Sequence, residues 1–170
     1  MDLKKFVRDI PDFPIPGILF RDITTVLKDP VALTHAVDAM VDQLGGVEFD
    51  AILGPESRGF IFGMPMAYKL CKGFVPVRKA GKLPGEVARR EYALEYGTAV
   101  IEIHKDAIVP DKRYIIADDL LATGGTAKAT ADLITEMGGI VASMLFFIEL
   151  AELKGRDVLD GYDVRSVLTY

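Results

Sequence analysis

Two adjacent carboxylates, Asp118 and Asp119, and a glycine turn with hydroxyl groups follow an apolar run in one short stretch of the chain. Carboxylate oxygens can accept hydrogen bonds from two vicinal hydroxyl groups. The turn offers what a phosphate needs, namely backbone N–H groups at a helix start, glycines without a Cβ atom and threonine hydroxyls. It comprises Ala122, Thr123, Gly124, Gly125 and Thr126. A diol site beside a phosphate site describes a ribose 5-phosphate.

The same residues could instead serve the fold alone. An aspartate pair after a strand can shape a turn, and threonine with two glycines can cap a helix. The turn has no lysine after its glycines, so it is not the triphosphate-binding loop, and its spacing is not G-x-G-x-x-G. The motif by itself leaves both interpretations open.

The apolar patterns predict strands that alternate with helices. We expect strands at 51–53, 74–77, 114–117, 140–150 and 164–168, and helices that begin near residues 30, 59 and 127. This alternation is typical of an α/β fold with a mainly parallel sheet and helices on both faces. Ligands bind beyond the carboxyl ends of such strands, where the aspartates and the turn would lie. Residues 92–103, with Gly97 at the turn, predict an antiparallel hairpin.

The N-terminal residues are expected to form a small hood near the site. Its first part has helical spacing of apolar residues, ended by Pro11, at Leu3, Phe6, Val7 and Ile10. In the helix after Gly59, the apolar side is assigned to Phe60, Met64, Ala67, Tyr68 and Cys71. Cys71 would therefore be a core residue.

Length and composition indicate one globular domain, residues 1–170, with no repeat or linker. A single cysteine, no apolar run of about 18 residues and no apolar signal core predict a cytoplasmic protein without a membrane partner. The net charge of −5 argues against nucleic acid as a partner. Residues 78–91 are rich in cations and glycine, which predicts a mobile loop. Such a loop could receive a small anionic ligand or simply be a solvated surface.

The string from Asp118 to Thr126 resembles the phosphoribosyl pyrophosphate-binding motif of type I phosphoribosyltransferases, in the form of their adenine-specific branch. Other segments resemble that branch in the same order. Residues 13–23 match its hood signature, 54–60 its pyrophosphate loop, 78–85 its flexible catalytic loop and 92–97 the strand that returns from it. The resemblance therefore covers nearly the whole chain. It implies a hood at 1–28 and a flexible catalytic loop at 78–97.

The resemblance implies the reaction of adenine with phosphoribosyl pyrophosphate to give AMP and pyrophosphate. Mg²⁺ would be held mainly through the substrate pyrophosphate, with no firm protein ligand. Asp118 and Asp119 would bind the ribose, and residues 122–126 the 5-phosphate. The pyrophosphate would contact Glu56, Ser57, Arg58, Arg78, Lys79 and Lys82. Adenine would contact Leu19, Phe20, Arg21 and Leu150.

The resemblance also assigns catalytic roles. Arg58 and Mg²⁺ would neutralise the leaving pyrophosphate as an oxocarbenium-like sugar develops. Glu95 would manage the proton of the base, and Tyr96 would help to exclude water. The family further implies a homodimer and a cis peptide bond between Glu56 and Ser57.

Two rival functions stay open at this point. The chain could transfer the phosphoribosyl group to hypoxanthine, guanine or xanthine, although the hood signature and residues 92–96 favour adenine. It could instead be a regulator that only senses phosphoribosyl pyrophosphate. A regulator usually adds a DNA-binding domain and loses catalytic-loop residues, whereas this chain retains Arg58 and Glu95.

Overall fold

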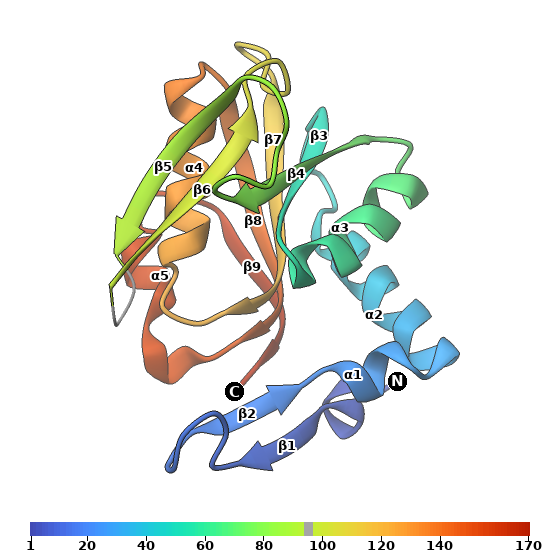
Figure 1. Cartoon of the computed structure of the whole chain (residues 1–170). Helices are drawn as coiled ribbons and strands as arrows, with labels where there is room; N and C mark the ends of the chain where they lie inside the picture. Colours follow the sequence, from blue (N-terminus) through green and yellow to red (C-terminus); the bar gives the residue numbers. More distant parts are fainter. Residues whose placement is uncertain (94–96) are drawn as a thin grey trace.

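The structure is a computed structural model that describes residues 1–93 and 97–170. Within these residues, seven strands form one sheet in the order β5-β6-β4-β3-β7-β8-β9 (Figure 1). Their bounds are β3 (Ala51–Pro55), β4 (Gly73–Lys79), β5 (Val87–Ala93), β6 (Thr98–His104), β7 (Arg113–Leu121), β8 (Ile140–Glu149) and β9 (Val164–Thr169). The neighbours from β4 to β9 pair in parallel, and β6 pairs antiparallel with β4 and β5. The prediction of a mainly parallel α/β sheet is confirmed.

Helices cover both faces of the sheet, as predicted. Helices α2 (Pro30–Gln43) and α3 (Arg58–Lys69) pack on one face, and α4 (Gly125–Glu136) packs on the other (Figure 1). Successive side chains of a strand point to opposite faces. In β7, Ile115 and Ala117 therefore join the core under α2 and α3, whereas Tyr114 and Ile116 join the core under α4. No helix in 1–93 or 97–170 has the length and apolar character needed to cross a membrane.

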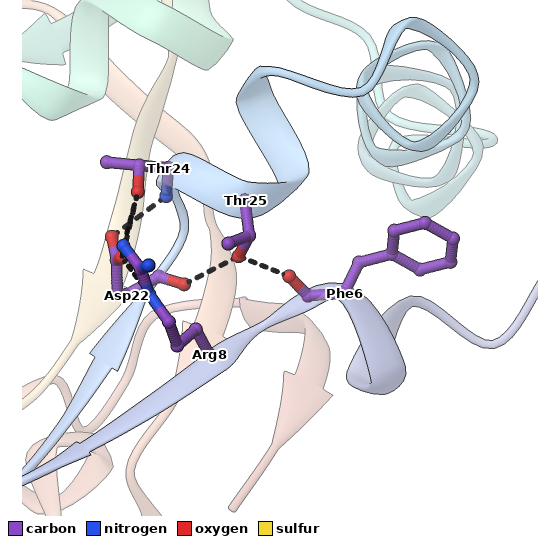
Figure 2. Close-up of polar contacts among 5 residues, drawn as sticks. All are labelled: Phe6, Arg8, Asp22, Thr24 and Thr25. Atoms are coloured by element: carbon purple, nitrogen blue, oxygen red, sulfur yellow. Dashed lines mark hydrogen bonds and ion pairs between the residues drawn. The ribbon is translucent and has the colours of Figure 1, made fainter.

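The hood is a two-stranded hairpin of β1 (Arg8–Pro11) and β2 (Leu19–Asp22). The predicted helix through Ile10 is wrong, because only Leu3–Phe6 forms a single 3-10 turn. Pairing with β2 and an ion pair from Arg8 to Asp22, at 2.5 Å, outweigh the helical spacing. Asp22 also accepts a hydrogen bond from the Thr24 N–H at 2.9 Å, which ties the hairpin to α1 (Thr24–Leu27) (Figure 2).

The C-terminal residue holds the hood against the sheet. The chain end lies beside β2 (Figure 1), and the Arg21 guanidinium lies 4.1 Å from the centroid of the Tyr170 ring. Lys4 lies over the same ring at 4.9 Å. Cation–π contacts of this kind favour a fixed position of the hood over the carboxyl end of the sheet.

The predicted inner side of α3 is wrong in part, although Ala67 is buried as predicted. Tyr68 is 86% exposed and Cys71 is exposed, whereas Phe62 and Met66 are buried. Gly63 explains the difference, because a Cβ atom there would lie 2.6 Å from the Phe74 ring. The buried side of the helix combines Phe62 and Met66 with Gly59, Gly63 and Ala67. Hydropathy does not give the glycines weight, so the pattern of apolar residues indicated a different side.

The predicted loop at 78–91 is shorter in the structure. Strand β4 includes Arg78 and Lys79, and β5 begins at Val87, so the connection covers only residues 80–86. The charges that suggested a loop have partners across the fold: Arg89 pairs with buried Glu102 at 2.7 Å, and Arg90 pairs with Asp132 of α4 at 2.9 Å. The predicted hairpin is confirmed, but its first strand starts earlier.

Candidate active site

A cavity of about 280 Å³ lies at the carboxyl ends of β3, β4 and β7. This is the edge at which a parallel α/β sheet binds ligands. The cavity brings together most of the predicted polar residues, whose segments are far apart in the sequence. The predicted residues that line it are the polar Glu56, Ser57, Arg58, Arg78, Lys79, Asp118, Asp119 and Thr126, together with Ala122.

The aspartate pair lies within β7 rather than after it. The prediction of a strand that stops at Ala117 is wrong, because pairing with β8 continues from Asp118 to Leu121. The ladder uses backbone groups, so polar side chains at a site edge do not end it. The extension places both carboxylates on rigid backbone at the cavity.

Charge repulsion is concentrated at this pair. Removal from water raises the pKa of Asp118 well above its usual range, and the neighbouring Asp119 carboxylate raises it further. Burial also raises the pKa of Asp119, although the Arg58 guanidinium opposes the rise. Arg58 Nε lies 3.1 Å from Asp119 Oδ2. Two carboxyl groups held this way are suited to accept hydrogen bonds from a ligand diol.

The segment between β3 and α3 carries the cis peptide bond between Glu56 and Ser57 that the resemblance implied. Glu56 Oε1 accepts hydrogen bonds from the Lys79 N–H at 2.6 Å and from Arg78 Nε at 3.3 Å. A carboxylate at this position repels an anion, so its contribution is to orient the Arg78 guanidinium and to fix the backbone at Lys79. Arg78 and Lys79 line the cavity, whereas Lys82 is exposed and does not.

The pH dependence of stability tests the interaction of Glu56. Burial would raise the pKa of Glu56, but the Lys79 N–H and the Arg78 guanidinium outweigh it and hold the pKa below its ordinary value. A lowered pKa in the folded state adds stability above the unfolded-state pKa, and this stability is lost as the pH falls through the folded-state pKa. Glu56→Gln is expected to lower the melting temperature at pH 7 more than at pH 3. An equal change at both pH values would contradict the charge interaction.

A second, adjoining cavity of about 90 Å³ is formed by the phosphate turn, residues 122–126, with Asp118, Leu120, Leu121, Ala127 and Phe146. Gly124 has φ +83° and directly precedes α4. The N-cap makes no side-chain hydrogen bond, so the first N–H groups of α4 are left for water or a ligand. Residues 125–127, at this helix start, line the cavity. A helix start with a glycine turn and threonine hydroxyls is suited to an anion.

Tyr92 of β5 lines the larger cavity and was missed by the sequence reasoning. Its hydroxyl lies 3.0 Å from Thr126 Oγ1, which connects the hairpin to the phosphate turn. The sequence feature that could have identified Tyr92 is its position at the start of residues 92–97, which resemble the family's strand that returns from the catalytic loop. Glu95 and Tyr96, the other predicted residues of that segment, lie outside the described residues.

The predicted base-binding residues are more dispersed. The Phe20 ring lies near the site, 5.9 Å from Arg58 Cζ, and packs edge-on against Phe13. Leu19 is 45% exposed, and the Arg21 side chain is turned to Tyr170 and Asp9. The Leu150 N–H donates to the Leu121 carbonyl at 2.9 Å, beside the end of β7. None of these four residues lines the cavity of about 280 Å³, and Phe20 instead lines a neighbouring cavity that also includes Phe13 and Arg58.

The residues fit a magnesium ion that takes much of its coordination from a ligand. Among the described residues there is no cluster of three or more His, Cys, Asp or Glu side chains with metal-binding geometry. Asp118 and Asp119 supply the carboxylate oxygens that Mg²⁺ prefers, and Asp119 is already paired with Arg58. Phosphate oxygens and water would have to complete the coordination.

Comparison with known proteins places this arrangement in a known class. Residues 28–168 match the family model of the phosphoribosyl transferase domain. The adenine phosphoribosyltransferase of Lachnoclostridium phytofermentans is 56% identical over 168 residues, which are 99% of this chain and 97% of that protein. The fold is therefore that of a phosphoribosyltransferase.

Solved structures agree with this class. The adenine phosphoribosyltransferase from Thermoanaerobacter pseudethanolicus is 53% identical, with a TM-score of 0.97 and coverage of 99% of this chain and 98% of that chain. The enzyme from Saccharomyces cerevisiae, in complex with an imino-altritol bisphosphate and adenine, is 40% identical, with a TM-score of 0.92 and coverage of 98% and 96%. The chain belongs to the adenine phosphoribosyltransferase family, whose members are transferases of purine salvage.

Proposed function

We propose that this chain catalyses the Mg²⁺-dependent reaction of adenine with phosphoribosyl pyrophosphate to give AMP and pyrophosphate. The observation that carries the proposal is the pair of adjoining cavities at the strand ends, with carboxylates between a phosphate turn and a group of cations. This order matches the order of 5-phosphate, ribose and pyrophosphate in the substrate. The relatives named as adenine phosphoribosyltransferases support the choice of base.

Each part of the substrate has a proposed place. The 5-phosphate binds the phosphate turn and the first N–H groups of α4. The ribose hydroxyls donate to Asp118 and Asp119. The pyrophosphate lies against Arg58, Arg78 and Lys79, near the Glu56–Ser57 peptide. Binding energy from these remote groups positions the anomeric carbon for attack by the base.

The chemical step is an exchange at the anomeric carbon through an oxocarbenium-like transition state. The bond to pyrophosphate breaks ahead of bond formation to adenine N9. Asp118 and Asp119 place negative charge beside the developing cation, and Arg58 stabilises the departing pyrophosphate. Glu95 takes the role of hydrogen-bond partner or general acid/base of the purine, and Tyr96 helps to exclude water. The proposed surroundings of the base are Leu19, Phe20, Arg21 and Leu150.

Three further assignments belong to this proposal. When bound, Mg²⁺ neutralises charge on the pyrophosphate. The chain forms a homodimer in which a loop cation, such as Lys82, reaches the neighbouring site as the catalytic loop moves. The single cysteine and the purine-salvage family support a cytoplasmic location.

The specificity for the base tests the proposal. The ratio kcat/KM should be measured for adenine, hypoxanthine, guanine and xanthine, each with phosphoribosyl pyrophosphate and Mg²⁺. We expect a preference for adenine of at least about 10³-fold, because buried polar groups that match one base are left unpaired by another. A preference for one of the other bases would contradict the base assignment while keeping the phosphate and ribose sites.

A further inference from the structure

The short helix α5 (Gly155–Val158) lies directly behind the phosphate turn, outside the cavity that the turn lines. A Cβ atom on Gly155 would lie 2.3 Å from the Ala122 carbonyl oxygen. A Cβ atom on Gly124 would lie 2.6 Å from the Gly155 carbonyl oxygen. The backbones of helix and turn are therefore in mutual contact, with glycine on both sides, so a shift of α5 must move the turn.

One side chain fastens α5 to the sheet. Arg156 Nε and Nη2 each lie 2.7 Å from one carboxylate oxygen of Glu149, at the end of β8. Arg156 Nη1 donates to the Val164 carbonyl of β9 at 2.7 Å. The planar fork of arginine matches a carboxylate with two parallel hydrogen bonds, which fixes direction as well as distance. Arg156 thus connects α5 to two neighbouring strands.

Glu149, the carboxylate that pairs with Arg156, is itself held in place by further contacts. Glu149 is only 7% exposed, and its Oε2 accepts a further hydrogen bond from Ser166 Oγ at 2.7 Å. The Arg156 guanidinium, opposed by burial and assisted by Ser166, holds the pKa of Glu149 below its usual range. A nearly buried carboxylate that loses its arginine is left without charge compensation, so the arrangement favours one geometry strongly.

We propose that α5 is a brace for the 5-phosphate site and that Arg156, which contacts no substrate, is the positioning residue that sets this brace. The inference rests on the proposed function, because it assigns the phosphate turn to the 5-phosphate. Phe20 and Arg21, two of the proposed base-binding residues, lie in the hood and contact Arg58 and Tyr170 instead of α5. The brace therefore acts on the phosphate end of the substrate, and the hood side of the base site is held separately.

Arg156→Met tests the brace through binding as well as turnover. We expect the Kd for ribose 5-phosphate, measured by titration calorimetry, and the KM for phosphoribosyl pyrophosphate to rise about tenfold to hundredfold, the effect of a small misplacement in a binding site. The KM for adenine should change by less than about twofold. Arg156→Lys keeps the positive charge without the planar guanidinium, and its affinity for ribose 5-phosphate should lie between those of Arg156→Met and the original protein. If Arg156→Met does not fold, the affinity of Arg156→Lys tests the brace instead.

Two further variants separate the brace from general stability. Gly155→Ala leaves Arg156 and Glu149 intact but pushes against Ala122, and it should weaken ribose 5-phosphate binding in the same way. Arg165→Met is the matched control, because Arg165 of β9 pairs with Asp163 at 2.8 Å. Loss of this pair should leave the Kd for ribose 5-phosphate and the KM for phosphoribosyl pyrophosphate unchanged.

The possible outcomes separate a failure of the brace from a failure of the proposed function. Unchanged ribose 5-phosphate affinity in Arg156→Met and Gly155→Ala would overturn the brace. A parallel loss of affinity for adenine and for ribose 5-phosphate would also overturn it, because α5 would then only stabilise the fold. Failure of the unaltered protein to bind ribose 5-phosphate would instead overturn the proposed function.

Discussion

Asp118→Asn is expected to stabilise the ligand-free protein at neutral pH and to lower the rate of AMP synthesis by about 10²-fold or more. Asparagine keeps the shape of the side chain but removes a charge that lies beside Asp119 in a partly buried position. Functional sites hold such unfavourable charges because the substrate needs them. The stabilisation should be on the order of 1 kcal/mol, or about 2–4 °C in melting temperature for a domain of this size.

The sign of the pH effect follows from the raised pKa of Asp118. A carboxyl group whose pKa is raised in the folded state favours folding below its unfolded-state pKa, and this contribution is lost as the pH rises through the folded-state pKa. The advantage of Asp118→Asn should therefore be present at pH 7 and should shrink toward pH 4. Melting temperatures of both proteins across this range measure it. A variant that is less stable than the original at pH 7 would contradict the repulsion.

Arg58→Met is expected to have the largest effect on catalysis, a fall in kcat/KM of about 10³-fold or more. The arginine has two tasks, because it lines the pyrophosphate side of the cavity and compensates the Asp119 carboxylate at 3.1 Å. Without it, Asp119 loses the cation that pairs with it directly, so the affinity of the two aspartates for Mg²⁺ and protons should increase. Steady-state kinetics with varied phosphoribosyl pyrophosphate measures the loss.

Arg58→Lys is the matched variant, since it keeps a positive charge but not the guanidinium geometry. We expect it to recover part of kcat/KM. Arg8→Met, which removes an arginine of the hood that pairs with Asp22, controls for a general loss of charge. If the Arg58→Met variant kept kcat/KM within about twofold of the original protein, the assignment of leaving-group stabilisation to Arg58 would be wrong.

The parts of the fold predicted correctly are those encoded by local patterns. The run 114–117 and the run from Ile140 are apolar enough to indicate buried parallel strands, and Asp29 accepts hydrogen bonds from Val31 and Ala32 as the N-cap of α2. The phosphate turn was also predictable, because its glycines, hydroxyls and helix start are contiguous in the sequence.

The errors have a common physical origin in contacts between distant residues. The helical spacing near the N-terminus lost to pairing with β2, and the charges of β5 were mistaken for a loop because Glu102 and Asp132 are not near them in sequence. The inner side of α3 was misassigned because Gly59 and Gly63 allow a close approach that hydropathy does not record. Tyr92 is placed at the cavity by the fold, where its hydroxyl meets Thr126, a residue distant in sequence.

The most direct test of the central claim is the stoichiometry of the products. AMP and pyrophosphate should be quantified together in reactions that contain the protein, Mg²⁺ and phosphoribosyl pyrophosphate, with and without adenine. We predict that the two products appear in equal amounts and only when adenine is present. Pyrophosphate release without AMP, or binding of phosphoribosyl pyrophosphate with no product, would contradict the account, and the second result would favour a sensor.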